Sequence, residues 1–318
     1  MVDVVLNPSG VRVIDPILTT HALGYRHAES VGHLLFPRVY VQVSGGQVLE
    51  FGKEDFKLWN TRRAPGARTR RIDFGYLGRP YALLNRGLEG KLPREFIRDA
   101  SQVPGIDLGR GVVTKTQNAM SLGIEAEQAA IATNANSYDG NHKLALSGAA
   151  KWSASTGTPI TDIAAAREAV RATTGMYPNV AILSPDVWTA ARDNPQVLER
   201  FKYTKGGPVT LDQFKALIEV DQVVVGKRTY ADDAGNFSDV WSNCMVLAYV
   251  GASGGNAAVD PLAIAEPSYG YTYTMTGQPA VEQPYWENNE KSWIYGVVEE
   301  SVPVQTGGLA GFLIQNAA

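Results

Sequence analysis

The sequence predicts an α+β fold, in which strands and helices occupy separate stretches around one inserted α/β segment. Residues 36–90 hold several short strand-like pieces separated by glycines and prolines. Residues 109–135 carry apolar side chains at the spacing of one long helix. Residues 269–276 alternate Tyr or Met with Gly or Thr in a strict period of two, which is the pattern of a strand. Long runs of one element type favour the α+β class.

Length and composition limit the classes of protein that the sequence can encode. The 318 residues suggest two domains, or one domain with large excursions. The 44% hydrophobic and 19% charged residues are typical of a folded protein. With 29 basic and 32 acidic residues the net charge is −3, which argues against a dedicated nucleic-acid coat or a polybasic membrane binder. No run of about 18 apolar residues is present, so no transmembrane helix is expected.

The first 92 residues are expected to be extended. Residues 1–35 mix short apolar pieces with prolines and glycines, which is typical of an arm that packs on something else. Residues 36–92 are interpreted as a long, twisted β-excursion with strands near 39–43 and 48–51.

Residues 93–177 are expected to be mainly helical. A short helix begins with Pro93 at its first position, where the missing N–H is not needed. A long helix follows Asp107 as its N-cap, and a further helix begins at Thr158-Pro159 and ends at Gly175, a residue suited to a left-handed C-terminal position. Apolar side chains follow the long helix at helical spacing: Val112, Ala119, Leu122, Ala126 and Ala130, with Met120, Ile124 and Ile131 beside them.

Residues 178–262 show the rhythm of a compact α/β domain. The apolar runs at 180–183, 223–225 and 245–249 are too continuous for strands with one face in water, so a buried central sheet is expected. Helix starts are indicated by Ser184-Pro185, by Asn194-Pro195 and by a capping box at Thr210. Residues 263–318 then return to strands, at 269–276, 293–302 and 309–315.

No catalytic, cofactor or metal site is predicted. Cys244, the single cysteine, lies in an apolar run and is expected to be a small buried side chain rather than a nucleophile. Asp232, Asp233 and Asp239 lack the spacing of an EF-hand, so a hairpin turn is the simpler interpretation. Residues 251–255 match the Gly-x-Ser-x-Gly pattern around Ser253, but no elbow between a strand and a helix is expected there and no histidine partner is indicated. The histidines are not spaced as a zinc pair: His21, His27, His33 and His142.

Two charged segments are the most unusual local features. A ten-residue segment of the β-excursion contains five arginines: Arg62, Arg63, Arg68, Arg70 and Arg71. Such a run is consistent with a solvated loop tip, with contact to nucleic-acid phosphates, or with docking on an acidic surface of another subunit. Against a single Lys291, the stretch 282–300 holds five acidic residues: Glu282, Glu287, Glu290, Glu299 and Glu300. One sequence therefore contains two patches that can pair between chains.

The most specific part of the sequence is a succession of short segments between residues 136 and 203. In order, these are Asn136-x-Tyr138, Lys151-Trp152-Ser153, Pro159-Ile160-Thr161-Asp162-Ile163, and Tyr177-Pro178-Asn179 with Ser184-Pro185 and Trp188 after it. This succession, with the architecture on either side of it, resembles the major capsid proteins of tailed bacteriophages that have the Hong Kong 97 type fold.

The resemblance assigns a role to each part of the chain. It implies an N-terminal arm at 1–35, an extended β-hairpin (E-loop) at 36–92 and a peripheral domain with a long spine helix at 93–177. It further implies an axial α/β domain at 178–262 and the C-terminal strands of the peripheral domain at 263–318. The arm and the E-loop are expected to pack mainly on neighbouring subunits, because neither supplies enough contiguous apolar surface for a core of its own.

The resemblance also implies a structural, non-enzymatic function. Copies of the chain would form the hexamers and pentamers of an icosahedral head that encloses double-stranded DNA, assembled in the cytoplasm of a host bacterium. The family's founding member carries a scaffolding domain ahead of its arm, and this sequence begins at the arm. A separate scaffolding protein and a portal are therefore expected as partners, with a decoration protein as an optional one and no membrane.

Two other functions compete with this hypothesis. One is a nucleic-acid-binding protein that uses the arginine-rich loop 62–71, and the other is a hydrolase-like enzyme built on residues 178–262. Within the capsid hypothesis, the arginines are expected to dock on a neighbouring subunit rather than to hold DNA. They lie in the part that resembles the E-loop, which runs along the outer and lateral surface of the shell in that family.

Overall fold

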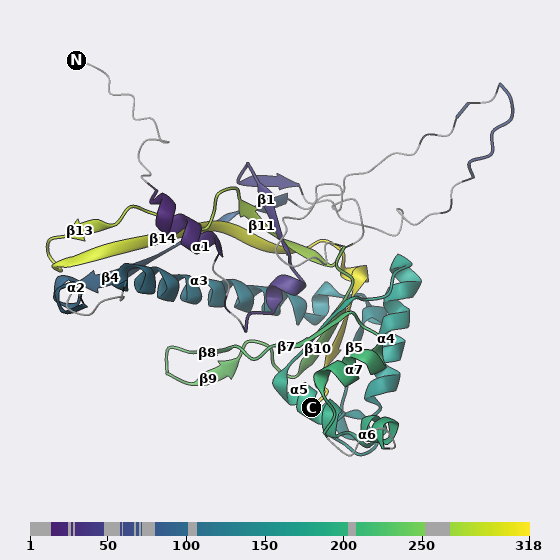
Figure 1. Ribbon diagram of the computed structural model, residues 1–318. Helices are drawn as coiled ribbons and strands as arrows, with labels where there is room; N and C mark the ends of the chain where they lie inside the picture. Colours follow the sequence, from purple (N-terminus) through teal and green to yellow (C-terminus); the bar gives the residue numbers. More distant parts are fainter. Residues whose placement is uncertain are drawn as a thin grey trace.

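The computed structural model describes residues 14–24, 27, 29–47, 58, 60–66, 68–69, 71, 80–100, 107–202, 208–251 and 268–318. These residues form a six-stranded sheet, a five-stranded sheet and two separate two-stranded ribbons. Figure 1 shows the six-stranded sheet along the helix α3 (Leu108–Ala132) and the five-stranded sheet at the C-terminal end of that helix. The predicted α+β class is confirmed.

The six-stranded sheet is organised around β14 (Ser292–Gln305), its longest strand. One side of β14 pairs with β4 (Leu84–Pro93) over ten residues. Its other side pairs in turn with β13 (Tyr285–Glu287), β12 (Ala280–Val281) and β11 (Gly270–Met275). Strand β1 (Arg38–Val41) adds to β11 in parallel. Helix α3 packs on β4 and β14, beside the short helix α1 (Pro16–Gly24).

Helix α3 begins as predicted and buries polar as well as apolar side chains. Asp107 is its N-cap and accepts a hydrogen bond from the backbone N–H of Arg110 at 3.1 Å. Of the apolar side chains expected at helical spacing, Ala119 and Ala130 are exposed, whereas Ile124 is buried. Four of its eight buried residues are polar or charged, namely Thr116, Gln117, Glu125 and Gln128, and the other four are Val113, Ile124, Ala129 and Ala132. Partners elsewhere in the chain stabilise such burial; for example, Gln128 Nε2 donates to Thr272 Oγ1 at 2.9 Å.

The five-stranded sheet has the order β5-β15-β10-β6-β7, formed by β5 (Lys143–Ala145), β15 (Gly311–Gln315), β10 (Cys244–Ala248), β6 (Val180–Leu183) and β7 (Gln222–Val225). Alternate residues of β6 and β10 face opposite cores. One face packs with helices α4 to α7, and the other packs with the end of α3 and with residues 31–36. Because both faces are covered, the apolar runs of β6 and β10 are confirmed as buried strands. The run at 223–225 forms β7 at the edge of the sheet, where Val223 is buried and Val224 and Val225 are half-buried.

Local signals placed the helices of this region correctly. These are α4 (Pro159–Thr174), α5 (Pro185–Asp193), α6 (Pro195–Phe201) and α7 (Leu211–Ile218). Gly175 ends α4 with φ +75°, a conformation that suits glycine. Thr210 and Gln213 form the predicted capping box.

The remaining elements are short. Helix α2 (Arg94–Ala100) follows Pro93, which ends β4 instead of starting the helix as predicted. The ribbons are β2 (Gly45–Gln47) with β3 (Pro80–Ala82), and β8 (Thr229–Ala231) with β9 (Phe237–Asp239). Single turns of 3-10 helix lie at Gly32–Leu34, Ala135–Ser137, Gly140–His142, Gly148–Ala150 and Gly308–Ala310.

Pairing between distant segments crosses two of the predicted boundaries. Strand β15 lies inside the five-stranded sheet, hereafter the axial sheet, between β5 and β10 and not with the other C-terminal strands of 263–318. Strands β1 and β4, at the two ends of 36–92, belong to the six-stranded sheet. The second strand predicted in this excursion, at 48–51, lies outside the described residues.

The described part of the N-terminal arm packs on its own chain, contrary to expectation. Residues 16–24 form α1, whose Ala22 is buried against Val113 and Val281. Leu35 and Phe36 are fully buried in the core that covers one face of the axial sheet. This apolar cover explains the difference, because without it that face of the sheet would be exposed to water.

At Gly90, strand β4 packs closely against α3. A Cβ at this position would overlap Val112 Cγ1 and lie 2.7 Å from Thr116 Oγ1. We expect Gly90→Ala to lower the free energy of unfolding by ~1–3 kcal/mol through overpacking. Gly111→Ala is the matched control on α3, where a Cβ meets no atom within 4 Å, and it should raise stability by ~0.5–1 kcal/mol. Denaturant titration of the unassembled chain measures both; equal effects would contradict the packing argument.

Candidate inter-subunit surfaces

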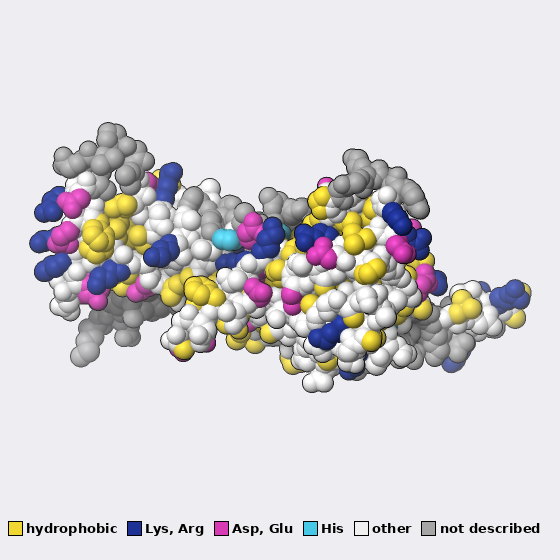
Figure 2. Space-filling model, turned by 90° about the horizontal axis from the view of Figure 1, so that it is seen from below, with side chains coloured by type: hydrophobic (Ala, Val, Ile, Leu, Met, Phe, Trp, Pro, Cys, Tyr) yellow, Lys and Arg dark blue, Asp and Glu magenta, His cyan; other side chains and the backbone are white. Residues whose placement is uncertain are grey.

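The arginine-rich segment is an exposed projection. Arg62, Arg63, Arg68 and Arg71 are all exposed, whereas Arg70 lies outside the described residues. Leu58, just before them, is 99% exposed. Figure 1 shows the described parts of this segment far from both sheets, and Figure 2 shows basic side chains on a projection beyond the body. On the face of the body seen in Figure 2, basic and acidic side chains are interspersed. The segment is positioned to contact another molecule.

The five glutamates of residues 282–300 are the acidic candidates for contact between subunits. They lie along β12 to β14, and most of them are at least partly exposed. Glu282 and Glu287 are partly exposed. Glu290 is exposed, and its Oε2 lies 2.9 Å from Lys91 Nζ. Glu300 is partly exposed and exchanges hydrogen bonds with Gln278. Figure 1 shows β13 at the end of the molecule opposite to the arginine-rich segment, so contact between these two parts requires two copies of the chain.

Glu299 does not belong to this accessible set. Its residue exposure is only 3%, and its Oε1 lies 2.9 Å from Nη2 of Arg38 in the same chain. The alternation of β14 directs this side chain toward the interior, where an unpaired charge would be strongly unfavourable. The prediction that Glu299 is a docking residue is therefore wrong. Its ion pair with Arg38 instead connects β14 with β1 within one chain.

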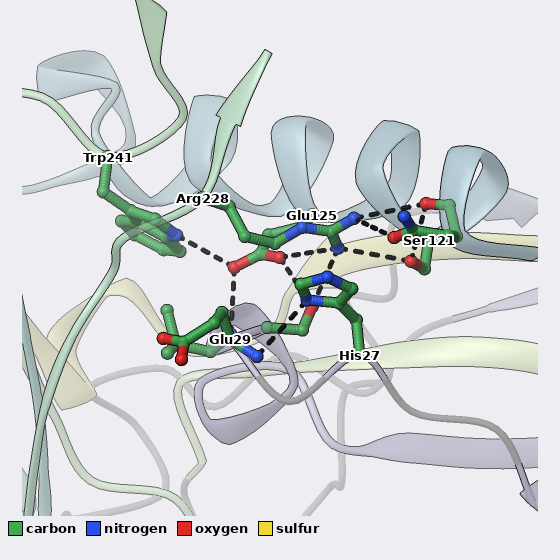
Figure 3. A network of polar contacts seen from close by, with 9 residues as sticks. His27, Glu29, Ser121, Glu125, Arg228 and Trp241 are labelled. Carbon is green, nitrogen blue, oxygen red and sulfur yellow. Dashed lines mark hydrogen bonds and ion pairs between the residues drawn. The ribbon is translucent and has the colours of Figure 1, made fainter. Parts of the chain in front are cut away.

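A buried ion pair, which the sequence analysis did not identify, joins three parts of the chain (Figure 3). Arg228 Nη1 lies 3.1 Å from Glu125 Oε2, and the two side chains are 5% and 1% exposed. The Glu125 carboxylate also accepts hydrogen bonds from the backbone N–H of Val31 at 2.9 Å and from Trp241 Nε1 at 3.2 Å. Ser30 Oγ donates to the same carboxylate at 2.5 Å.

Arg228 has further partners on α3. Its Nη2 donates to Asn118 Oδ1 at 2.9 Å, and its Nη1 donates to Ser121 Oγ at 3.2 Å. Charge-assisted bonds of this kind are stronger than neutral ones, and they offset the cost of burying both charges. The network therefore fixes the arm at residues 30–31, and the chain on both sides of the β8–β9 ribbon, against α3. Glu125 and Arg228 are 103 positions apart, so no local pattern indicates their contact.

The other groups considered for chemistry have structural roles. Cys244 is 2% exposed, and burial raises the pKa of its thiol to about 12, which disfavours the nucleophilic thiolate. Asp232 closes the predicted hairpin turn by accepting hydrogen bonds from the Asn236 backbone and side chain, and these bonds lower the pKa of its carboxyl group. Within the described ranges, no cluster of three metal-ligating side chains is present, and no helix is long and apolar enough to cross a membrane.

Comparisons with known proteins agree over most of the chain. Residues 127–302 match the family described as Phage major capsid protein E. A major capsid protein of Burkholderia phage BcepMu is 36% identical over 274 residues, which cover 86% of this chain and 87% of that protein. A crystal structure of a phage-related protein from Bordetella bronchiseptica RB50 has a TM-score of 0.82 and 47% identity, covering 96% of this chain and 98% of the other.

A more distant likeness concerns the fold alone. The mature capsid of bacteriophage PhiM1 aligns with a TM-score of 0.52 at 12% identity, covering 92% of this chain and 88% of the other.

Removing one partner of the buried pair should strongly destabilise the chain. Arg228→Met leaves the Glu125 carboxylate buried without its cation, so we expect a loss of ~3–5 kcal/mol in the free energy of unfolding. Arg171→Met is the control, because it removes an arginine from an exposed pair with Glu168 and should change the stability far less. Denaturant unfolding measures both variants. Losses of equal size would show that the buried pair has no special importance.

Thiol labelling tests the assignment of Cys244 as a buried structural residue. Because its pKa is raised to about 12, the thiol stays protonated at pH 8 as well as being shielded from solvent. We expect almost no labelling by a thiol reagent in the native protein and complete labelling in denaturant. Rapid labelling of the native chain would contradict this assignment.

Proposed function

The chain belongs to the family of phage major capsid proteins and has the Hong Kong 97 type of capsid fold, and from this premise we propose how its copies assemble. As a coat protein it builds the capsid from copies of itself. We propose that the copies form hexameric and pentameric capsomers of an icosahedral head around double-stranded DNA. We further propose that they assemble in the host cytoplasm with a separate scaffolding protein and a portal, and that decoration proteins can bind the finished head.

The projecting arginine-rich segment carries the proposed mode of assembly. It extends from one end of the molecule, whereas β13 and the turn to β14 lie at the other end. A contact between different surfaces of successive copies is head-to-tail, and repeated with rotation it closes a ring. We therefore place the segment of one copy on the acidic strands of the next, with Glu282, Glu287, Glu290 and Glu300 as its candidate partners.

Family membership favours a structural role over both competing functions. A coat protein acts through repeated interfaces and needs no catalytic group. The alternative of a nucleic-acid-binding protein that uses residues 62–71 gains no support from the family.

Electron microscopy of the purified, expressed chain tests the assembly proposal. We expect closed particles of megadalton mass, with five-fold and six-fold capsomers in projection averages. A chain that stays monomeric or dimeric at high concentration, alone and with its scaffolding partner, would overturn the proposal.

Removing the arginines should weaken assembly without unfolding the chain. We expect replacement of Arg62, Arg63, Arg68, Arg70 and Arg71 by Ser to lower the particle yield, with a growing loss at high salt, where remaining pairs are screened. Each exposed pair contributes only ~0.2–1 kcal/mol, but the contact recurs at every subunit. The control makes the same change of charge on the body, at Arg94, Arg98, Arg110, Arg171 and Arg192.

Particle yield by sedimentation and DNA content by absorbance separate the outcomes. An equal loss of yield in both variants would assign the effect to net charge. Normal particles that lack DNA would show that the segment faces the genome.

A further inference from the structure

The β8–β9 ribbon exposes both of its faces. All six of its strand residues are exposed, and Phe237 and Tyr230 keep 78% and 42% of their surfaces accessible. Figure 1 shows the ribbon extending from the five-stranded sheet beneath α3, with no element packed on its free end. A two-stranded ribbon has little stability alone, and the side chains on both faces of this one are accessible to a partner.

The ribbon is also strongly acidic. Residues 229–239 contain Asp232, Asp233 and Asp239 and no basic residue. Among the described residues, no cation lies within ion-pair distance of these three carboxylates. The strand register places Ala231 opposite Phe237 and Thr229 opposite Asp239, so Phe237 and Asp239 share one face. That face offers an aromatic ring beside a carboxylate.

The buried network of Figure 3 mounts this ribbon rigidly. Arg228 precedes β8, Trp241 follows β9 by two residues, and both bind the Glu125 carboxylate on α3. The backbone N–H of Val240 donates to the carbonyl of Arg228 at 2.9 Å and closes the base. Because the base is fixed while the strands are exposed, the ribbon presents its side chains in one orientation, as a docking element must.

We propose that the β8–β9 ribbon is a docking surface for a second copy of this chain, which binds it through the arginine-rich segment 62–71. The chemistry of the two segments is complementary, since guanidinium groups pair with carboxylates and also stack on aromatic rings. Five arginines without an acidic residue would face three aspartates without a basic one. The ribbon and the arginine-rich segment extend in opposite directions from the body, as a head-to-tail contact requires.

This inference rests on the proposed self-assembly and refines the position of the contact. Of the acidic residues on β12 to β14, Glu299 is buried and Glu290 already has Lys91 as a partner. The ribbon carboxylates have no such internal cation among the described residues. The ribbon therefore places three such carboxylates within residues 232–239, whereas the remaining candidates of β12 to β14 are spread over residues 282–300.

Charge reversal with rescue tests the pairing. Asp233→Lys with Asp239→Lys leaves Asp232, which holds the turn, unchanged. We expect this variant to keep the unfolding free energy of the unchanged chain but to lower particle yield by about tenfold or more, because the lost contact recurs at each subunit. Adding Arg63→Glu, Arg68→Glu and Arg71→Glu in the same chain should restore most of the yield. Asp193→Lys with Glu199→Lys, on exposed positions of α5 and α6, is the matched control and should assemble normally.

The outcomes separate this inference from the assembly proposal. If the unchanged chain forms no particles, either alone or with its scaffolding partner, the assembly proposal fails. If the unchanged chain assembles and the ribbon variant assembles equally well, the inference is overturned and the assembly proposal stands. Loss of yield without rescue also overturns it, because the ribbon would then contact something other than the arginine-rich segment. Phe237→Ser, which leaves every charge in place, should lower the yield as well.

Discussion

One buried carboxylate, that of Glu125, determines where three distant parts of the chain meet. A charge that is 1% exposed is tolerated only if hydrogen bonds and a cation replace the water it has lost. Arg228, Trp241 and the arm residues Ser30 and Val31 supply these partners. The Glu125 carboxylate has all of these partners only when the three parts of the chain lie together. The arm, the spine helix and the base of the β8–β9 ribbon are therefore held together as one rigid unit.

That unit explains why the rest of the chain can project. Behind residues 30–31, Leu35 and Phe36 cover one face of the axial sheet, while helices α4 to α7 cover the other face. Strand β14 and then β15 connect the two sheets through the C-terminal chain. With both sheets covered internally, the arginine-rich segment and the β8–β9 ribbon remain as exposed, charged elements of opposite sign. A coat protein needs this combination, because a firm body keeps its contact surfaces in fixed directions.

Features that depend on neighbours in the sequence were predictable from it. The end of α4 at Gly175, the capping box at Thr210 and the period-two strand β11 follow from local backbone chemistry, and the structure confirms them. Features that depend on distant partners were not. The strand at 309–315 is apolar enough for either sheet, and only its pairing with β10 and β5 assigns it to the axial one. The polar part of the buried face of α3 was missed because Glu125 and Gln128 are read as surface residues until their partners are known. Glu299 was placed on the surface for the same reason, since its partner Arg38 is far away in the chain.

The position of the arginine-rich segment in the assembled particle is the most direct test of this account. Electron cryomicroscopy of the particles, at a resolution that shows side chains, would identify what residues 62–71 contact. The account predicts that they lie on the flank of a neighbouring copy, against its β8–β9 ribbon and the strands β12 to β14. Density for these arginines on their own chain, or on the inner surface beside the packaged DNA, would contradict it.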